Sequence, residues 1–162
     1  MQRSSLVIGV AGGTGSGKTT VALGLMAAFR QLGYVVQPFK CGPDFIDPGL
    51  HQLVTSTVSR NLDPWMCGED FTRMCYARHM RHGEVVVIEG VMGMFDGGMS
   101  SSSSLSQLLE LPGILVLDVR SMAESAAAIV KGFETLNPAA APVGVILNRV
   151  ASKRHLQLVS DA

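Results

Sequence analysis

The stretch VAGGTGSGKTT, residues 10–20, carries the strongest signal for the fold class of this chain. It meets the pattern G-x-x-x-x-G-K-[ST] through Gly12, Gly17, Lys18 and Thr19. Glycines let the backbone turn tightly and approach an anion, and the N–H groups of such a loop, at a helix N-terminus, point toward phosphate. The stretch therefore predicts a phosphate-binding loop, provided that a strand precedes it and a helix follows it.

The sequence on both sides of this loop meets that condition. LVIGVA, residues 6–11, is a short run rich in β-branched residues, which is typical of a buried parallel strand. Residues 18–32 show an apolar helical face, and Gly33 is a helix stop signal. A glycine turn that binds nothing is the weaker interpretation in this context. The residues predicted to hold nucleotide phosphates are Gly13, Thr14, Gly15, Ser16, Gly17, Lys18, Thr19 and Thr20.

The remainder of the chain alternates between predicted strands and helices. The predicted strands are 34–39, 84–89, 113–118 and 142–148, and the predicted helices are 68–82, a short one within 100–111, 121–135 and 152–161. This alternation indicates an α/β fold with a mostly parallel sheet covered on both faces. Pro38 indicates that its strand ends there or lies at an edge.

Two segments fall outside this alternation. Residues 40–65 are rich in Gly, Pro and Asp, and we expect a long functional loop with a single helical turn near Leu50. The serine run 100–104 offers an N-cap for the following helix, and its low complexity predicts a mobile loop.

Composition narrows the classes of protein. The chain has 162 residues, which suits one domain, and is 47% hydrophobic. Its 13 basic residues balance 13 acidic ones, which argues against a charge-driven nucleic-acid partner. No apolar run reaches the roughly 20 residues that span a bilayer, so no membrane partner is expected.

Neither the cysteines nor the histidines show metal-ligand spacing. The cysteines are Cys41, Cys67 and Cys75, without a C-x-x-C pair. The histidines are His51, His79, His82 and His155, without an H-E-x-x-H pattern. A disulfide framework and a zinc site are therefore not expected, and reduced thiols predict a cytoplasmic protein.

Charged residues at the predicted strand ends form the candidate site. Glu89 closes the strand EVVVIE and resembles a Walker-B acid near Mg²⁺. Because the carboxyl ends of strands in such sheets face one crevice, we expect these residues to converge. They are Lys18, Thr19, Lys40, Asp44, Asp47, Glu89 and Asp96. For each aspartate an Asx turn or helix cap is the competing interpretation, and for Asp63, before Pro64, this competing interpretation is favoured.

Two differences from known P-loop patterns narrow the class. Guanine-specific proteins use N-K-x-D after a late strand, but here Asn148 is followed three residues later by Ala151, which argues against GTP specificity. Partitioning and transport ATPases carry a lysine at the start of K-G-G-x-G-K, where this chain has Gly13. These ATPases are therefore disfavoured.

Three longer stretches carry a family resemblance. KCGPDFIDPGLHQLV (40–54), SRNLDPWM (59–66) and VIEGVMGMFDGG (87–98) closely resemble the synthetase part of the cobyrinic acid a,c-diamide synthases, and the resemblance extends over nearly the whole chain. These are glutamine-dependent amidotransferases of cobalamin biosynthesis. The resemblance implies a three-layer α/β/α P-loop fold like that of dethiobiotin synthetase. It also implies a ligase that uses ATP and Mg²⁺ to activate the a- and c-acetate carboxylates as acyl phosphates.

The resemblance also implies roles for individual residues. The residues implied in catalysis are Lys18, Lys40, Asp44, Asp47, Glu89 and Asp96. The implied neighbours of Mg²⁺ are Thr19, Asp44 and Glu89. Asp47 and Asp96 are assigned to the substrate carboxylate, the ammonia or its proton, and Asn148 to a hydrogen bond with adenine.

The chain departs from the family in lacking a recognisable glutaminase domain. None of its cysteines lies in the glycine-rich turn that such a domain places around its nucleophile. We therefore expect residues 1–162 to be a single, truncated P-loop amidation domain. Its ammonia would come from a glutaminase domain or subunit or from solution, and related folds allow a homodimer. The alternatives are a synthetase for hydrogenobyrinic acid or another tetrapyrrole, and a module that only binds ATP.

Overall fold

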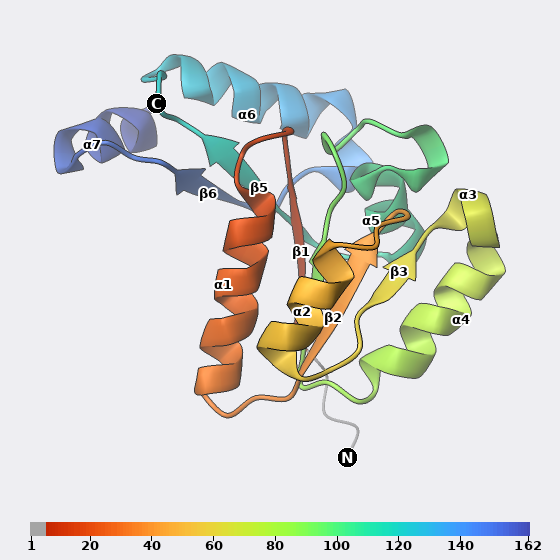
Figure 1. Cartoon of the computed structure of the whole chain (residues 1–162). Coiled ribbons are helices and arrows are strands. Elements are labelled where there is room, and N and C mark those ends of the chain that lie inside the picture. The colour runs from red at the N-terminus through yellow and green to blue at the C-terminus, as the bar shows by residue number, and fades with distance from the viewer. Residues whose placement is uncertain (1–5) are drawn as a thin grey trace.

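A computed structural model describes residues 6–162, so the first five residues of the predicted domain lie outside the described part (Figure 1). Six strands form one sheet in the order β3-β2-β4-β1-β5-β6, and every neighbouring pair is parallel. The strands are β1 Leu6–Gly12, β2 Val36–Cys41, β3 Arg60–Leu62, β4 Val85–Glu89, β5 Gly113–Asp118 and β6 Gly144–Asn148. The predicted parallel α/β fold is confirmed.

Helices follow the strands and cover the sheet. They are α1 Lys18–Gln31, α2 Asp47–Thr55, α3 Pro64–Cys67, α4 Glu69–Met80, α5 Ser102–Leu109, α6 Ser125–Leu136 and α7 Lys153–Asp161. Two 3₁₀ turns, η1 Gly98–Ser100 and η2 Pro138–Ala140, complete the connections. None of the helices in residues 6–162 has the length and apolarity needed to cross a membrane.

The strand β4 shows how the layers are built, because its alternate side chains point to opposite faces. Val85 and Val87 join a buried cluster with Met26 of α1. Val86 and Ile88 join a second cluster with residues of α4 and α5. In Figure 1, α1 and α2 lie side by side over one face of the sheet. The sheet therefore forms the middle of a three-layer arrangement.

A separate cluster supports the far end of the sheet. Leu117 of β5 and Val119 are buried with Ala126 of α6 and Val159 of α7. This cluster holds the ends of β5 and β6 next to the loop after β1, because β5 pairs with β1 on one side and β6 on the other. Segments about 130 residues apart in the sequence therefore meet at one edge of the crevice.

The prediction of a long loop over residues 40–65 is wrong. The helical turn expected near Leu50 belongs to the nine-residue helix α2, the short strand β3 follows, and the one-turn helix α3 begins at Pro64. Asp44 Oδ1 accepts hydrogen bonds from the N–H groups of Ile46 and Asp47, which starts α2. Glycine and proline here punctuate short elements, and a composition-based interpretation treats them as loop.

The serine run is also ordered differently from the prediction. Residues 102–104 form the first turn of α5, and the Ser101 side chain accepts from Ser104 N, so the predicted N-cap is confirmed and the mobile loop is wrong. Ser101 and Ser103 are buried. The strand expected at 34–39 lies two residues later, at Val36–Cys41. It is internal, but β3 pairs with it only from Phe39 onward, so Pro38 has a neighbouring strand on one side only.

Candidate active site

The loop between β1 and α1 has the backbone geometry that its glycines predict. Gly12 has φ +152°, and a Cβ there would clash with Val116 O of the neighbouring strand. Gly17 has φ +92° and would clash through a Cβ with the side-chain amide of Asn148. Only glycine fits these two positions without strain. The loop is therefore shaped by close contact with β5 and with the end of β6.

Lys18 is folded into this loop. Its Nζ donates to Gly13 O at 2.8 Å and to Gly12 O at 3.1 Å, and the residue is 9% exposed. Burial and then the positive charge of Lys40 lower the pKa of Lys18, although nearby carboxylates, including that of Asp96, oppose the shift. A poorly solvated ammonium beside backbone N–H groups is suited to hold a phosphate.

Sheet register brings Lys40 and Glu89 together. Lys40 of β2 is the register partner of Glu89 of β4. Alternation places Glu89 on the same face as Val85 and Val87, which is the face covered by α1. The Lys40 Nζ lies 3.3 Å from Glu89 Oε1, and both side chains are buried. The sequence-predicted convergence of these two residues is therefore a consequence of parallel pairing.

Lys40 also binds the start of α2. Its Nζ donates to Asp47 Oδ2 at 2.6 Å and to Gly90 O at 3.0 Å, while Asp44 Oδ2 lies 3.8 Å away. Burial by itself lowers the pKa of Lys40, but the hydrogen bond to Asp47 and the charges of Glu89 and Asp47 outweigh it, so the pKa lies above its ordinary value. Lys40 is therefore a firmly charged cation shared among acidic groups.

Glu89 is fully buried and hydrogen-bonded through both carboxylate oxygens. Oε1 accepts from the Thr19 hydroxyl, and Oε2 pairs with His51 Nε2 at 2.7 Å. Burial alone raises the pKa of Glu89, but the hydrogen bonds from His51 and Thr19, together with the Lys40 charge, outweigh it and hold the pKa below its ordinary value. The carboxylate is thus kept charged beside the first turn of α1.

Sequence reasoning missed His51. It is fully buried on α2, and its Nδ1 lies 3.0 Å from Ser59 Oγ. The absence of an H-E-x-x-H pattern removed it from consideration. A usable signal was its position four residues after Asp47, which places both on one face of a helix. That the partner of this histidine is Glu89 required the tertiary structure.

The remaining aspartates form local turns, as the competing interpretation predicted. Asp44 Oδ1 is occupied by the amides at the start of α2. The exposed Asp96 accepts from Gly93 N at 3.2 Å within its own loop. Asp63 Oδ1 accepts from Trp65 N and Met66 N, so the Asx turn or helix cap favoured there is confirmed, in the form of a helix cap. Catalytic roles for Asp44 and Asp96, and the place of Asp44 beside Mg²⁺, stay predictions.

Asn148 and Arg149 hold the P-loop from the other side. Asn148 Nδ2 donates to Ser16 O at 2.8 Å. Arg149 Nη1 donates to Gly15 O at 2.9 Å and to Asp118 Oδ2 at 2.5 Å. Contact between Asn148 and adenine stays a prediction, and Arg149 was not identified from sequence. The sequence signal for Arg149 is the stretch LNR, residues 147–149, in which only the asparagine was considered as a site residue.

Thr19 and Glu89 fit a Mg²⁺ site. The Thr19 hydroxyl and the Glu89 carboxylate touch at the N-terminal turn of α1, and both are hard oxygen donors. Residues 6–162 contain no group of three or more His, Cys, Asp or Glu side chains that could hold a metal ion. Mg²⁺ in phosphate sites commonly uses one or two protein oxygens, with phosphates and waters supplying the others.

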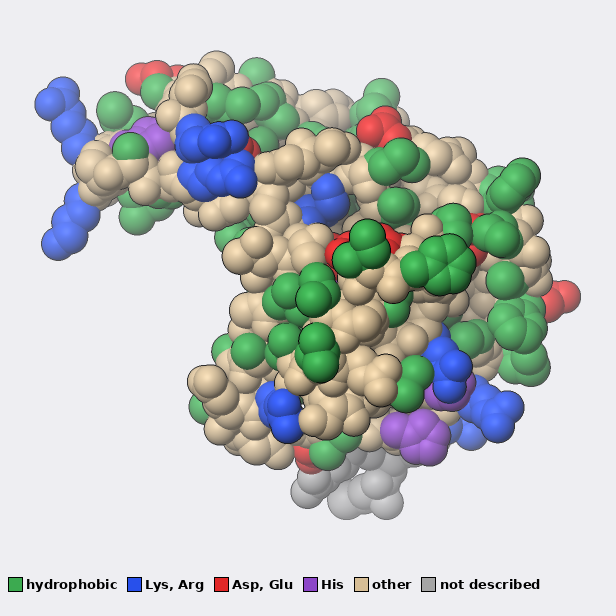
Figure 2. Space-filling view, viewed as in Figure 1, with side chains coloured by type: hydrophobic (Ala, Val, Ile, Leu, Met, Phe, Trp, Pro, Cys, Tyr) green, Lys and Arg blue, Asp and Glu red, His purple; other side chains and the backbone are tan. Residues whose placement is uncertain are grey.

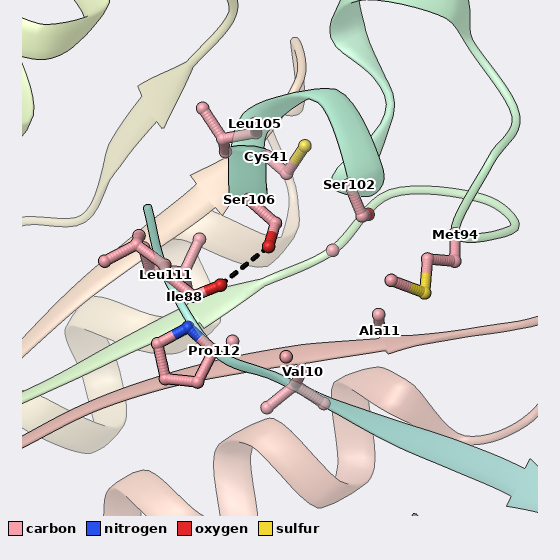
Figure 3. Close-up of a pocket in the computed structure, with 13 residues that line it drawn as sticks. Val10, Ala11, Cys41, Ile88, Met94, Ser102, Leu105, Ser106, Leu111 and Pro112 are labelled. Carbon is pink, nitrogen blue, oxygen red and sulfur yellow. Dashed lines mark hydrogen bonds between the residues drawn. The ribbon is translucent and has the colours of Figure 1, made fainter. Parts of the chain in front are cut away.

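A separate small pocket lies under α5, on the face of the sheet opposite α1. It has a volume of about 30 Å³ and is lined mainly by apolar groups, including Val10, Ile88, Met94 and Leu105 (Figure 3). Ligand pockets usually enclose roughly 300 Å³ or more. This pocket is therefore too small for a nucleotide.

The fold and the site together define a P-loop nucleotide-binding protein of the parallel α/β class. Residues 7–162 match the family model described as the CobQ/CobB/MinD/ParA nucleotide binding domain. The chain belongs to this family.

Curated relatives point to one part of the family. The chain is 50% identical over 160 residues to the cobyrinate a,c-diamide synthase of Priestia megaterium, covering 94% of this chain and 35% of that protein. It is 46% identical over 169 residues to the hydrogenobyrinate a,c-diamide synthase of Mycobacterium tuberculosis (strain ATCC 25618 / H37Rv), covering 99% and 37%. The chain thus spans little more than a third of the length of these relatives.

Solved structures support the fold alone. The signal recognition particle 54 kDa protein of Aeropyrum pernix K1 in complex with GDP matches with a TM-score of 0.69 at 16% identity, over 94% of this chain and 37% of that one. The signal recognition particle receptor FtsY of Elizabethkingia anophelis in complex with GDP matches with a TM-score of 0.63 at 17% identity, over 91% and 49%.

Proposed function

We propose that this chain is the ATP-binding synthetase part of a corrinoid a,c-diamide synthase, which converts acetate carboxylates of the macrocycle to amides. The observation that carries this proposal is the Lys18–Lys40–Glu89 arrangement beside the P-loop, in which Lys40 is held 3.3 Å from Glu89. The names of the 46–50% identical relatives support the substrate class. The cytoplasm is the expected compartment.

In the first step, a substrate carboxylate oxygen attacks the γ-phosphorus of ATP. The bond between that phosphorus and the β,γ-bridging oxygen breaks, ADP leaves, and an acyl phosphate forms. This reaction depends chiefly on positioning and charge neutralisation. Lys18 and Lys40 supply two cations, and Mg²⁺, held by Thr19 and Glu89, would neutralise further phosphate charge.

In the second step, ammonia attacks the acyl carbon and inorganic phosphate leaves. The nitrogen then loses a proton, which an aspartate at the mouth of the site can accept. Asp47 and Asp96 are our candidates. Asp47 is bonded to Lys40, whereas the exposed Asp96 faces solvent. Ammonia would be supplied by a glutaminase domain or subunit.

The surface beside the site suits a broad apolar substrate. Phe45 and Ile46, directly after Asp44, are 95% and 76% exposed, and Met92 after β4 is 51% exposed. Figure 2 shows hydrophobic side chains gathered over α2, with acidic atoms beside them. A macrocycle could cover these side chains while a peripheral carboxylate reaches Lys40. A second chain could bury the same surface in a homodimer.

Two substrate assignments remain, because the relatives act by name on either cobyrinate or hydrogenobyrinate. The site residues described here contact phosphate and carboxylate groups and do not distinguish a cobalt-containing ring from a metal-free one. We propose cobyrinic acid as the substrate, with hydrogenobyrinic acid as the alternative. A chain that only binds ATP is the remaining candidate.

Calorimetric titration tests the nucleotide part of the proposal. ATP·Mg²⁺ should bind, GTP·Mg²⁺ should bind far more weakly, and Lys18→Ala should lose the ATP signal. Incubation with ATP, ammonium and either cobyrinic or hydrogenobyrinic acid should then yield the diamide of one acid, detected by mass spectrometry. ATP binding without amidation of either acid would support the ATP-binding module, and absence of binding would contradict the proposal.

A further inference from the structure

We propose that His51 is a positioning residue, which fixes the Glu89 carboxylate so that its Oε1 stays beside Thr19. The importance of this role rests on the proposed function, because Thr19 and Glu89 are the proposed neighbours of Mg²⁺. The hydrogen bonds themselves do not depend on which substrate is amidated. His51 would thus act through Glu89 and would not touch the nucleotide.

His51 is fully buried, and each of its two ring nitrogens has a hydrogen-bond partner. His51 and Glu89 are each fully buried, and His51 Nε2 lies 2.7 Å from Glu89 Oε2. The Lys40 ammonium lies 3.3 Å from Glu89 Oε1, and the ionised carboxylate that this pairing favours only accepts hydrogen bonds, so Nε2 carries the hydrogen. The ring is also held from behind by Ser59 Oγ, 3.0 Å from Nδ1.

The two oxygens of Glu89 have separate partners. Oε1 contacts the Thr19 hydroxyl and lies 3.3 Å from Lys40 Nζ, whereas Oε2 is bonded to His51. The terminal torsion of a glutamate is broad, so one occupied oxygen does not fix the plane of the carboxylate. The bond from His51 to Oε2 holds this plane and thereby directs Oε1 toward Thr19.

The helix α2 connects this histidine to the rest of the site. Asp47, on the first turn of α2, binds Lys40 at 2.6 Å, and His51 lies one turn later. Thr55 Oγ1, one turn further along α2, donates to His51 O at 2.8 Å. Thus α2 carries one partner for Lys40 and one for Glu89, so its position sets both members of the buried pair.

Two substitutions at His51 test the two hydrogen bonds of its ring one at a time. The amide nitrogen of glutamine can take the place of histidine Nε2, and that of asparagine can take the place of Nδ1. His51→Gln therefore keeps a donor for Glu89, and His51→Asn keeps only a partner for Ser59. The matched control is His82→Asn, at an exposed histidine.

Calorimetry of ATP binding with Mg²⁺ and with EDTA supplies the main readout and needs no corrinoid or ammonia. His51→Asn should weaken ATP binding in Mg²⁺ about tenfold, the loss expected for one hydrogen bond to a charged group, and leave binding in EDTA unchanged. His51→Gln should stay within about threefold of the parent protein, because its donor to Glu89 is retained. Equal losses in Mg²⁺ and EDTA, or equal effects of the two variants, would overturn the proposal.

Nitrogen-15 NMR of the parent protein gives a test that needs no variant of His51. The Nε2–H signal of His51 should be present, protected from exchange and shifted by Glu89→Gln, while Ser59→Ala should shorten its lifetime against exchange. Absence of a protected Nε2–H signal would overturn the proposal even if the His51 variants do not fold. Intact Mg²⁺-dependent binding with no amidation would instead contradict only the proposed function.

Discussion

Cys41 and Cys67 have the same side chain but differ in burial. Cys41 is 1% exposed, and burial raises its pKa to about 11. Cys67, at the end of α3, is exposed. The thiolate is the reactive form of cysteine, so burial lowers both the access and the reactive fraction at Cys41. Cys41 is therefore a packing residue, although Lys40 beside it belongs to the site.

The order in which the thiols are alkylated tests this difference. With iodoacetamide at pH 8, Cys67 should be modified first and Cys41 last. The rate at Cys41 should be at least about a hundredfold lower than the rate at Cys67, because the thiolate fraction of Cys41 is suppressed. Peptide mass spectrometry over time measures both rates in one sample. Fast labelling of Cys41 in the folded chain would show that β2 is not packed as described.

At the scale of elements, α5 shows how a polar run becomes a buried helix. Its first turn consists of serines, which are poor helix formers in a helix interior but good ones at the N-terminus. Ser101 caps this turn, and Leu105 and Leu108 anchor the helix in the core cluster beside β4. The apolar anchors, which lie at helical spacing, outweigh the low complexity of the run.

Removal of the cap should therefore cost measurable stability. Ser101→Ala should lower the free energy of unfolding by about 1 kcal/mol, because Ser104 N loses its acceptor. Urea denaturation followed by circular dichroism gives this value. The control Ser160→Ala, at an exposed position in α7, should change it by less than about 0.5 kcal/mol. Equal effects would mean that Ser101 does not act as a cap.

At the scale of the whole molecule, the P-loop is held between two distant parts of the chain. Gly15 O accepts from Arg149, directly after β6, and Ser16 O accepts from Asn148, the last residue of β6, while Gly12 packs closely against Val116 of β5. Arg149 also binds Asp118 at the end of β5. The shape of the loop therefore depends on the order β1-β5-β6 as well as on its own glycines.

A pair of arginine variants tests this dependence. Arg149→Ala removes the bonds to both Gly15 O and Asp118 and should weaken ATP binding about tenfold. Arg120→Ala removes an exposed partner of Asp118 without touching the loop, so it should change the affinity by less than about threefold. Calorimetry measures both values. Similar losses of ATP affinity in the two variants would show that the loss comes from the missing bond to Asp118 and not from the missing contact with the loop.

Much of the site could be predicted from local patterns. The glycine loop, Lys18, Thr19 and the strand-end residues Lys40 and Glu89 are visible because strand alternation and loop spacing are local properties. The length of α2 was mispredicted, and the serine run is ordered where a mobile loop was predicted, since Gly, Pro and Ser favour both turns and helix starts. His51 and Arg149 have no local signal of this strength.

The order of amino acids is enough to predict the P-loop, the parallel α/β class and the set of charged residues at the strand ends. The folded chain adds three facts: Lys40 pairs with Glu89 in register, His51 holds the second oxygen of this carboxylate, and Arg149 binds the loop. The physical reason is that periodicity and turn chemistry act between neighbours in the chain. Register and burial arise when distant segments exclude water together.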